Sequence, residues 1–136
     1  MCLNRKKQLR VLLADPDELF RLRLRKAFCN SVVNAIVVGT VGTTVEATEF
    51  AKRHPVDMVV METHFLGSDF KGIEAIRTLA GIRPELQVAM VSQDASAALK
   101  AYQAGAAYYI VKTPLAHAIS QVLEVVSSNT GALKNS

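Results

Sequence analysis

The stretch Leu9–Asp17 reads LRVLLADPD, an apolar run that stops at two acids separated by a proline. Its first part, Leu9–Ala14, has the length of a β-strand. It shows no strict alternation of polar and apolar residues, which is typical of a strand buried on both faces of a parallel sheet. The next residues can start a helix, because Asp15 can cap it, Pro16 fits its first position and Glu18 follows three residues after the cap. The stretch therefore predicts a buried strand followed directly by a helix.

The alternation of a short apolar run with a longer amphipathic segment repeats along the chain. Four more runs are expected to be strands: Ala35–Val41, Val56–Met61, Gln87–Val91 and Ala107–Val111. Helices are expected where apolar residues recur at helical spacing, as in Phe20, Leu24, Ala27 and Phe28; Ala47, Phe50 and Ala51; Ile73, Ile76, Leu79 and Ala80; Ala95–Ala104; and Leu115, Ile119, Val122 and Val126. Five such units predict a doubly wound α/β fold, with a parallel sheet and helices on both faces.

The composition fits one globular domain. With 136 residues, half of them apolar and 21% charged, the chain has room for a single core. We divide it into a basic N-terminal extension (1–8), a domain (9–128) and a flexible tail or linker start (129–136). No apolar run reaches the roughly 20 residues that span a bilayer. Cys2 and Cys29 have neither disulfide nor zinc spacing, which favours a reducing compartment.

The formal charge of +4 is unevenly placed, because basic residues gather before Val11 and again in the segment Arg21–Lys26. Direct nucleic-acid binding is not favoured, since no aromatic residues alternate with these charges to stack against bases. A loose basic tail and a solvated helix face are the expected explanations.

Polar side chains follow four of the five expected strands. One stands at the end of each of the first, third, fourth and fifth runs: Asp15, Glu62, Ser92 and Lys112. We expect them to lie together, because chemistry in such folds collects at the carboxyl ends of the strands. An acid pair can hold Mg²⁺, and a hydroxyl and an ammonium suit the oxygens of a phosphoryl group. Purely structural roles are the alternatives: Asp15 or Ser92 as a helix cap, and Lys112 as an exposed strand-end lysine.

The order of these motifs resembles that of response-regulator receiver domains of two-component signalling, from about Leu9 to Val126. The matching segments are Val11–Asp17 (VLLADPD), Pro55–Glu62 (PVDMVVME), Val91-Ser92, Ala104–Ala106 (AGA) and Tyr108–Lys112 (YYIVK). The resemblance implies a flavodoxin-like (βα)5 fold with strand order 2-1-3-4-5. It also implies a phosphorylation pocket, with Glu62 at the position of the phospho-accepting aspartate and Tyr109 at that of the switch aromatic residue.

Two departures from the family pattern concern the pocket itself. Glu62 replaces the aspartate, and its extra methylene moves the carboxylate by about 1.5 Å, enough to impair in-line attack. Pro16 stands where the second acid of the metal pair is usual, and Asp17 is turned by about 100° along a helix. We therefore expect Asp15 and Glu62 to bind Mg²⁺ weakly at best, and we predict no other cofactor.

Two further departures lie beside the pocket. The loop from Glu62 to Gly72 is longer than usual, and His64 within it is expected to be a solvated loop residue. Thr113 rather than proline follows Lys112, so the family's cis Lys-Pro bond is lost and Pro114 is expected to start the last helix.

These features predict a degenerate receiver, not an enzyme, that acts through protein contacts. One alternative is an active phosphoryl-accepting receiver that uses Asp69 or Asp17. Another, of a different class, is a flavodoxin-like cofactor binder. The expected partner is a signalling protein or a histidine kinase, in the cytoplasm and without membrane contact. A homodimer through the helix 4–strand 5–helix 5 surface (about Ala95–Val126) and an effector domain beyond Ser136 are further expectations.

Overall fold

The computed structural model describes residues 8–66 and 70–134, without the side chains of 131–134. Strands and helices alternate along these ranges. In chain order they are β1 (Leu9–Ala14), α1 (Glu18–Cys29), β2 (Ala35–Val41), α2 (Thr44–Arg53), β3 (Met58–Met61), α3 (Lys71–Ile82), β4 (Gln87–Ser92), the short 3-10 helix η1 (Ala95–Ala97), α4 (Ala98–Ala104), β5 (Tyr108–Val111) and α5 (Leu115–Lys134).

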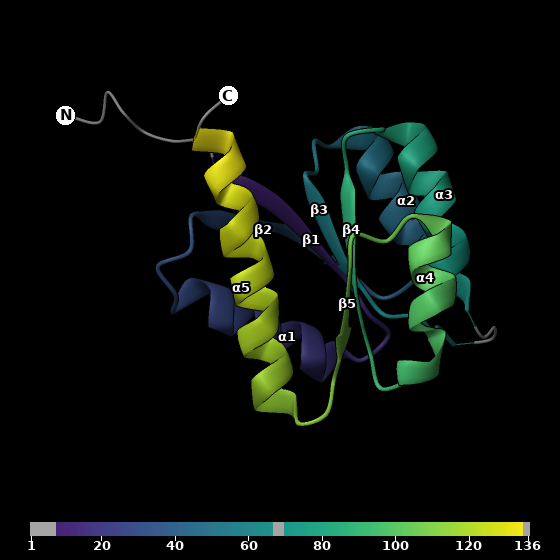
Figure 1. Ribbon diagram of the computed structural model, residues 1–136. Coiled ribbons are helices and arrows are strands. Elements are labelled where there is room, and N and C mark those ends of the chain that lie inside the picture. The colour runs from purple at the N-terminus through teal and green to yellow at the C-terminus, as the bar shows by residue number, and fades with distance from the viewer. Residues whose placement is uncertain (1–7, 67–69, 135–136) are drawn as a thin grey trace.

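The strands form one parallel sheet in the order β2-β1-β3-β4-β5. Figure 1 shows α1 and α5 on one face of this sheet and α2, α3 and α4 on the other. The strand order changes direction at β1, where β2 and β3 lie on opposite sides of it. The predicted flavodoxin-like, doubly wound (βα)5 fold is confirmed.

The sheet is buried on both faces because neighbouring residues of its central strands point to opposite sides. Leu12 and Val59 belong to the apolar cluster beneath α2, α3 and α4, whereas Leu13 and Val60 belong to the cluster beneath α1 and α5. None of these four side chains is more than 3% exposed. This double burial explains why the strands lack a polar–apolar alternation.

The start of α1 differs from the prediction. Asp17, not Asp15, caps the helix, since its Oδ1 accepts hydrogen bonds from the backbone N–H groups of Leu19 and Phe20. Asp15 extends β1 by one residue, and its N–H donates to the carbonyl of Val41 at 3.0 Å. Its side chain is thereby left at the sheet edge.

Other helix boundaries follow the sequence signals more closely. Thr43 caps α2, because its Oγ1 accepts from the Glu46 N–H at 3.1 Å. Gly105 ends α4 with a φ of 116°, a left-handed conformation that suits glycine. The helix expected over Ala95–Ala104 is divided into η1 and α4, and Asp94 caps η1.

The last helix is longer than expected. α5 (Leu115–Lys134) continues beyond residue 128, where the domain was expected to end. Polar side chains in its last turns bond back to the helix: Ser128 donates to the Glu124 carbonyl and Thr130 to that of Ser127. Polarity there therefore does not end the helix. The basic extension up to residue 7, and 135–136 of the expected tail, lie outside the described residues.

No helix in the described ranges combines the length and the apolar character needed to cross a bilayer.

Candidate functional site

Four neighbouring strand ends bring the expected site residues to one edge of the sheet. Backbone hydrogen bonds extend the ladder beyond the strands: the Glu62 N–H donates to the Ala14 carbonyl at 3.0 Å, and the Lys112 N–H donates to the Ser92 carbonyl at 2.9 Å. Side chains that follow β1, β3, β4 and β5 therefore start from the same edge of the sheet.

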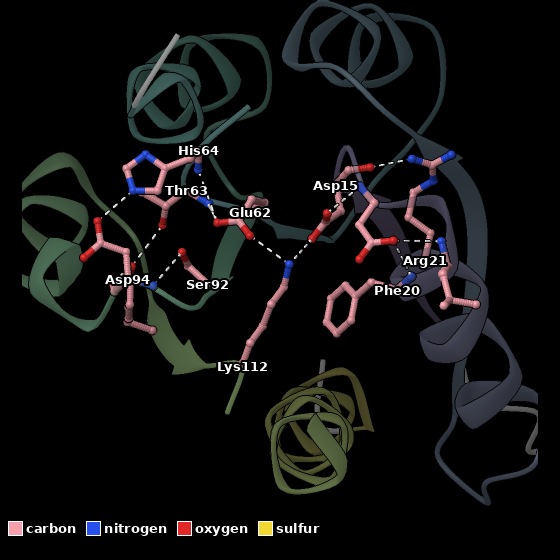
Figure 2. Close-up of polar contacts among 12 residues, drawn as sticks. Asp15, Phe20, Arg21, Glu62, Thr63, His64, Ser92, Asp94 and Lys112 are labelled. Carbon is pink, nitrogen blue, oxygen red and sulfur yellow. Dashed lines mark hydrogen bonds and ion pairs between the residues drawn. The ribbon is translucent and has the colours of Figure 1, made fainter. Parts of the chain in front are cut away.

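Lys112 lies between the two acids. Its Nζ donates to Asp15 Oδ2 at 2.9 Å and to Glu62 Oε1 at 2.8 Å, and Figure 2 shows it pointing between the two carboxylates. The three side chains are buried, with exposed fractions of 10% for Lys112, 5% for Asp15 and 11% for Glu62. The structure thus brings these three residues together, as the positions of the strand ends predict.

The other carboxylate oxygens are also engaged. Asp15 Oδ1 accepts from the Asp17 N–H at 2.8 Å. Glu62 Oε2 accepts from the N–H of Thr63 at 2.7 Å and from that of His64 at 3.2 Å. All four oxygens of the pair thus have donors within the protein, which offsets the desolvation of two buried acids.

Burial and charge act against each other on this cluster. Burial raises the pKa of Asp15, and the hydrogen bond from Lys112 opposes that change only in part. Burial alone would lower the pKa of Lys112, but hydrogen bonds to Asp15 and Glu62 outweigh it and raise the pKa above 10.5. Lys112 is therefore an ammonium ion at neutral pH.

Two residues of α1 brace this cluster. The ring of Phe20 lies 4.3 Å from Lys112 Nζ, close enough for a cation–π interaction. Arg21 Nη1 donates to the backbone carbonyl of Asp15. Sequence reasoning missed both contacts, since Phe20 was assigned only to the helix stripe and Arg21 to a solvated basic face.

The residues do not fit a divalent cation in this arrangement. Mg²⁺ is usually bound by one or two carboxylates and several waters, whereas the ammonium of Lys112 already lies between Asp15 and Glu62. Pro16 contributes no ligand, and the Asp17 side chain caps α1 instead of facing the pair. Within the residues that the structure describes, no group of three or more His, Cys, Asp or Glu side chains could hold a metal ion.

Beside the acid pair, Tyr109 joins β5 to the loops after β3 and β4. Its hydroxyl lies 3.0 Å from Thr63 Oγ1 and donates to the backbone carbonyl of Asp94. A phenol has one proton, so Thr63 is the donor in the first bond. Ser92 is turned toward the same loop, where its Oγ accepts from the Asp94 N–H at 3.2 Å.

His64 is not the solvated loop residue expected from the sequence. Its ring lies 2.7 Å, Nε2 to Oδ2, from Asp94, and its Nδ1 accepts from the Phe70 N–H at 3.0 Å. A backbone N–H can only donate, so the ring proton is on Nε2 and points to Asp94. Hydrogen bonds from Ser96 and from His64 hold the pKa of Asp94 below its ordinary value.

The start of α3 packs directly on the site. Gly72 donates its N–H to the Thr63 carbonyl, and a Cβ at Gly72 would lie 2.0 Å from the carbonyl oxygen of Glu62. Only a glycine permits this approach. Phe70, just before it, has a φ of 61°. Asp69, the alternative phosphoryl acceptor considered above, lies outside the described residues.

The loop between β5 and α5 differs from the sequence expectation in the position of a cis peptide bond and in the first residue of the helix. Lys112 is followed by a threonine, but the next peptide bond, Thr113–Pro114, is cis. The cis bond is therefore present one residue later than in the family pattern, and α5 begins at Leu115.

Comparisons with known proteins agree with this geometry. The family model described as "Response regulator receiver domain" matches residues 11–124. A comparison with curated proteins found no match. The response regulator domain of Thermotoga maritima CheB has a similar structure, with a TM-score of 0.75, 23% identity, and coverage of 95% of this chain and 98% of that one. A LuxR-family two-component response regulator from Aurantimonas sp. SI85-9A1 has a TM-score of 0.76, 24% identity, and coverage of 90% and 86%.

A third similar structure is the REC domain of AraT from Geobacillus stearothermophilus, with a TM-score of 0.77 and 21% identity over 91% of this chain and 96% of that one. At these identities the solved structures establish the fold, while the family model covers most of the chain. The chain belongs to the response regulator receiver domain family of two-component signalling.

Proposed function

We propose that this receiver domain is degenerate: Glu62 and Lys112 set its conformation, and it acts through protein contacts rather than by accepting a phosphoryl group at Glu62. The observation that carries the proposal is the bridge from Lys112 Nζ to Asp15 and Glu62, at 2.9 and 2.8 Å. The bridge gives the pocket a cation of its own and engages the carboxylate that would have to attack.

Phosphoryl acceptance needs a carboxylate oxygen that is free to attack in line and a cation that stabilises the transferred oxygens. Glu62 Oε1 is paired with Lys112, and Oε2 accepts from the backbone of Thr63 and His64. The longer side chain also places the carboxylate about 1.5 Å from where an aspartate would hold it. Three effects thus oppose attack by Glu62.

Asp17 is a poor substitute acceptor, because its Oδ1 caps α1. A cofactor-binding role is disfavoured too, since the acids Asp15 and Asp17 follow β1 where a flavodoxin-like protein needs a phosphate-binding loop.

Receiver domains interact with histidine kinases and effector domains. We propose that this chain binds a protein partner in the cytoplasm through the surface formed by α4, β5 and the start of α5. Large apolar side chains are exposed there: Leu99, Tyr102, Val111 and Leu115. A homodimer through this surface, or an effector domain that follows Ser136, is the proposed use of it.

The test is phosphoryl labelling by a small phosphodonor, such as acetyl phosphate, with Mg²⁺. The wild type is expected to take up no stable label, and Glu62→Asp, which restores the shorter acid, is the comparison variant. Stoichiometric label on the wild type that is stable to acid and labile to hydroxylamine would contradict the proposal. Label lost only in Asp69→Asn or Asp17→Asn would instead establish the active-receiver alternative.

A further inference from the structure

Tyr109 is held at both its backbone and its hydroxyl. The hydroxyl accepts from Thr63 and donates to the Asp94 carbonyl, while the Tyr109 N–H donates to the Tyr102 hydroxyl of α4 at 3.1 Å. The ring also packs against the apolar cluster beneath α2, α3 and α4. The backbone and side chain of this one residue therefore connect β5 with α4 and with the loops after β3 and β4.

These contacts are part of a closed ring of hydrogen bonds. Glu62 Oε2 accepts from the N–H groups of Thr63 and His64. The His64 ring reaches the Asp94 carboxylate, the Asp94 carbonyl accepts from Tyr109, and the Tyr109 hydroxyl accepts from Thr63. In Figure 2, Glu62, Thr63, His64 and Asp94 lie on the side of Lys112 opposite Asp15. The five residues of this ring, in order, are Glu62, His64, Asp94, Tyr109 and Thr63, and Thr63 bonds back to Glu62.

We infer that Thr63 and His64 are positioning residues that hold Tyr109 against the loop between β4 and η1, so that its inward position depends on side chains of the chain itself. The inference rests on the proposed function, in which Glu62 replaces the phosphoryl group as the determinant of conformation. It goes further by naming the residues through which Glu62 acts on Tyr109.

The Thr63 hydroxyl depends on Tyr109 because it is buried. Thr63 is fully buried, with 0% exposure, and its Oγ1 has Tyr109 as hydrogen-bond partner. A buried hydroxyl without a partner is costly, so outward movement of Tyr109 leaves Thr63 unsatisfied. If the Thr63 hydroxyl had a purely structural role, its removal would not be expected to move Tyr109.

The His64–Asp94 bond supports the other side of Tyr109. Asp94 carries the carbonyl that accepts from Tyr109, and the bond from His64 at 2.7 Å ties that residue to the loop after β3. Without His64, the Asp94 side chain and N–H would keep their bonds to Ser96 and Ser92 within the same loop, but the tie from the carboxylate to the loop after β3 would be lost. The acceptor for Tyr109 would then be less firmly placed.

The position of Tyr109 has a consequence for the proposed partner surface. Tyr102 accepts from the Tyr109 backbone, and Leu99 lies one turn earlier on the same helix with 67% exposure. The Tyr109 ring packs against the apolar cluster beneath α4, so outward movement of the ring is expected to alter how α4 packs on the sheet and presents Leu99. In this way these hydrogen bonds link Glu62 to the proposed partner surface.

The experiment is ¹⁹F NMR of the full chain labelled with 3-fluorotyrosine. The chain has three tyrosines, so three signals are expected, and Tyr102→Phe, Tyr108→Phe and Tyr109→Phe assign them. Thr63→Val removes the hydroxyl and keeps the shape, whereas Thr63→Ser keeps the hydroxyl. The H₂O/D₂O isotope shift of the Tyr109 signal reports its exposure.

Thr63→Val is expected to raise the outward population of Tyr109 about fivefold, the factor of one neutral hydrogen bond. Thr63→Ser is expected to leave the signal close to that of the wild type. His64→Leu is expected to move the signal in the same direction as Thr63→Val. Tyr108, whose hydroxyl accepts from Asn129 at 3.1 Å, is the internal control for an intact fold.

Equal shifts in Thr63→Val and Thr63→Ser would overturn the inference, because the hydroxyl would then not matter. An unmoved Tyr109 signal in both Thr63→Val and His64→Leu would overturn it as well. Neither result bears on phosphoryl acceptance, which is measured separately on the wild type with a phosphodonor. Failure of the ring and failure of the proposed function are therefore distinguishable.

Discussion

Lys112 and Glu62 form a buried ion pair, with 2.8 Å between Nζ and Oε1, although 50 positions separate them in the sequence. The pair exists because β3 and β5 lie on either side of β4 and end at the same edge of the sheet. Glu62 and Lys112 are the residues that directly follow these two strands. Asp15, from β1, completes the cluster on the other side of the ammonium.

Replacement of Lys112 by methionine is expected to destabilise the fold by about 3–5 kcal/mol, because two buried carboxylates lose their shared partner. The free energy of unfolding measured in urea tests this. Lys52→Met is the matched control, since Lys52 pairs with Glu49 on the surface and its loss should cost at most about 1 kcal/mol. Similar losses in the two variants would contradict the central role of Lys112.

The ion pair should also shape stability at alkaline pH. The pKa of Lys112 is raised in the fold, so its contribution is fully present below its ordinary pKa of 10.5 and is lost as the pH rises through the folded value. The wild type is expected to lose stability more steeply than Lys112→Met above pH 10.5. Urea unfolding curves across this range, compared between the two proteins, measure the difference. Parallel pH profiles would rule out the effect.

The effect of Mg²⁺ on stability tests whether Lys112 takes the place of a metal ion between Asp15 and Glu62. At millimolar concentration the ion is expected to leave the unfolding free energy of the wild type unchanged. Removal of the ammonium in Lys112→Met should let the acids attract Mg²⁺, and a ligand at 100 times its Kd would stabilise by about 2.7 kcal/mol. Stabilisation of the wild type as large as that of the variant would show that Lys112 does not compete with the ion.

Two glycines of α3 should respond in opposite ways to alanine. At Gly72 the new Cβ would meet the Glu62 carbonyl oxygen at 2.0 Å, so we expect a large loss of stability and a displaced Glu62. At Gly81 no atom lies within 4 Å, and alanine should stabilise the helix by about 0.5–1 kcal/mol. Thermal unfolding of both variants measures this, and a tolerated Gly72→Ala would mean that α3 can move away from the site.

The sequence predicts the fold well because its main signals are local or periodic. Buried strands show as apolar runs, and helix starts show as capping residues such as Thr43. The grouping of Asp15, Glu62 and Lys112 follows from the rule that parallel strands end at one edge. The ion pair itself was not predicted, because the acids were expected to hold Mg²⁺ and Lys112 to face a phosphoryl group or solvent.

The remaining contacts could not be predicted because they depend on which way a side chain turns. The sequence pattern points to Asp15 as the cap of α1, whereas Asp17 caps the helix and Asp15 faces Lys112. Thr63 and His64 belong to a loop without a periodic pattern. Their bonds to Tyr109 and Asp94 join segments about 30 to 46 positions apart, a pairing for which composition gives no signal.

The bond from the Tyr109 N–H to the Tyr102 hydroxyl has a consequence for aggregation as well as for signalling. β5 is an outer strand of the sheet, and unpaired N–H groups on such a strand are a template for strands from other chains. Tyr102 occupies one of these donors from its own helix. A partner that reached β5 by adding a strand would have to displace that phenol, so the same bond that ties β5 to α4 also protects one donor of the sheet edge.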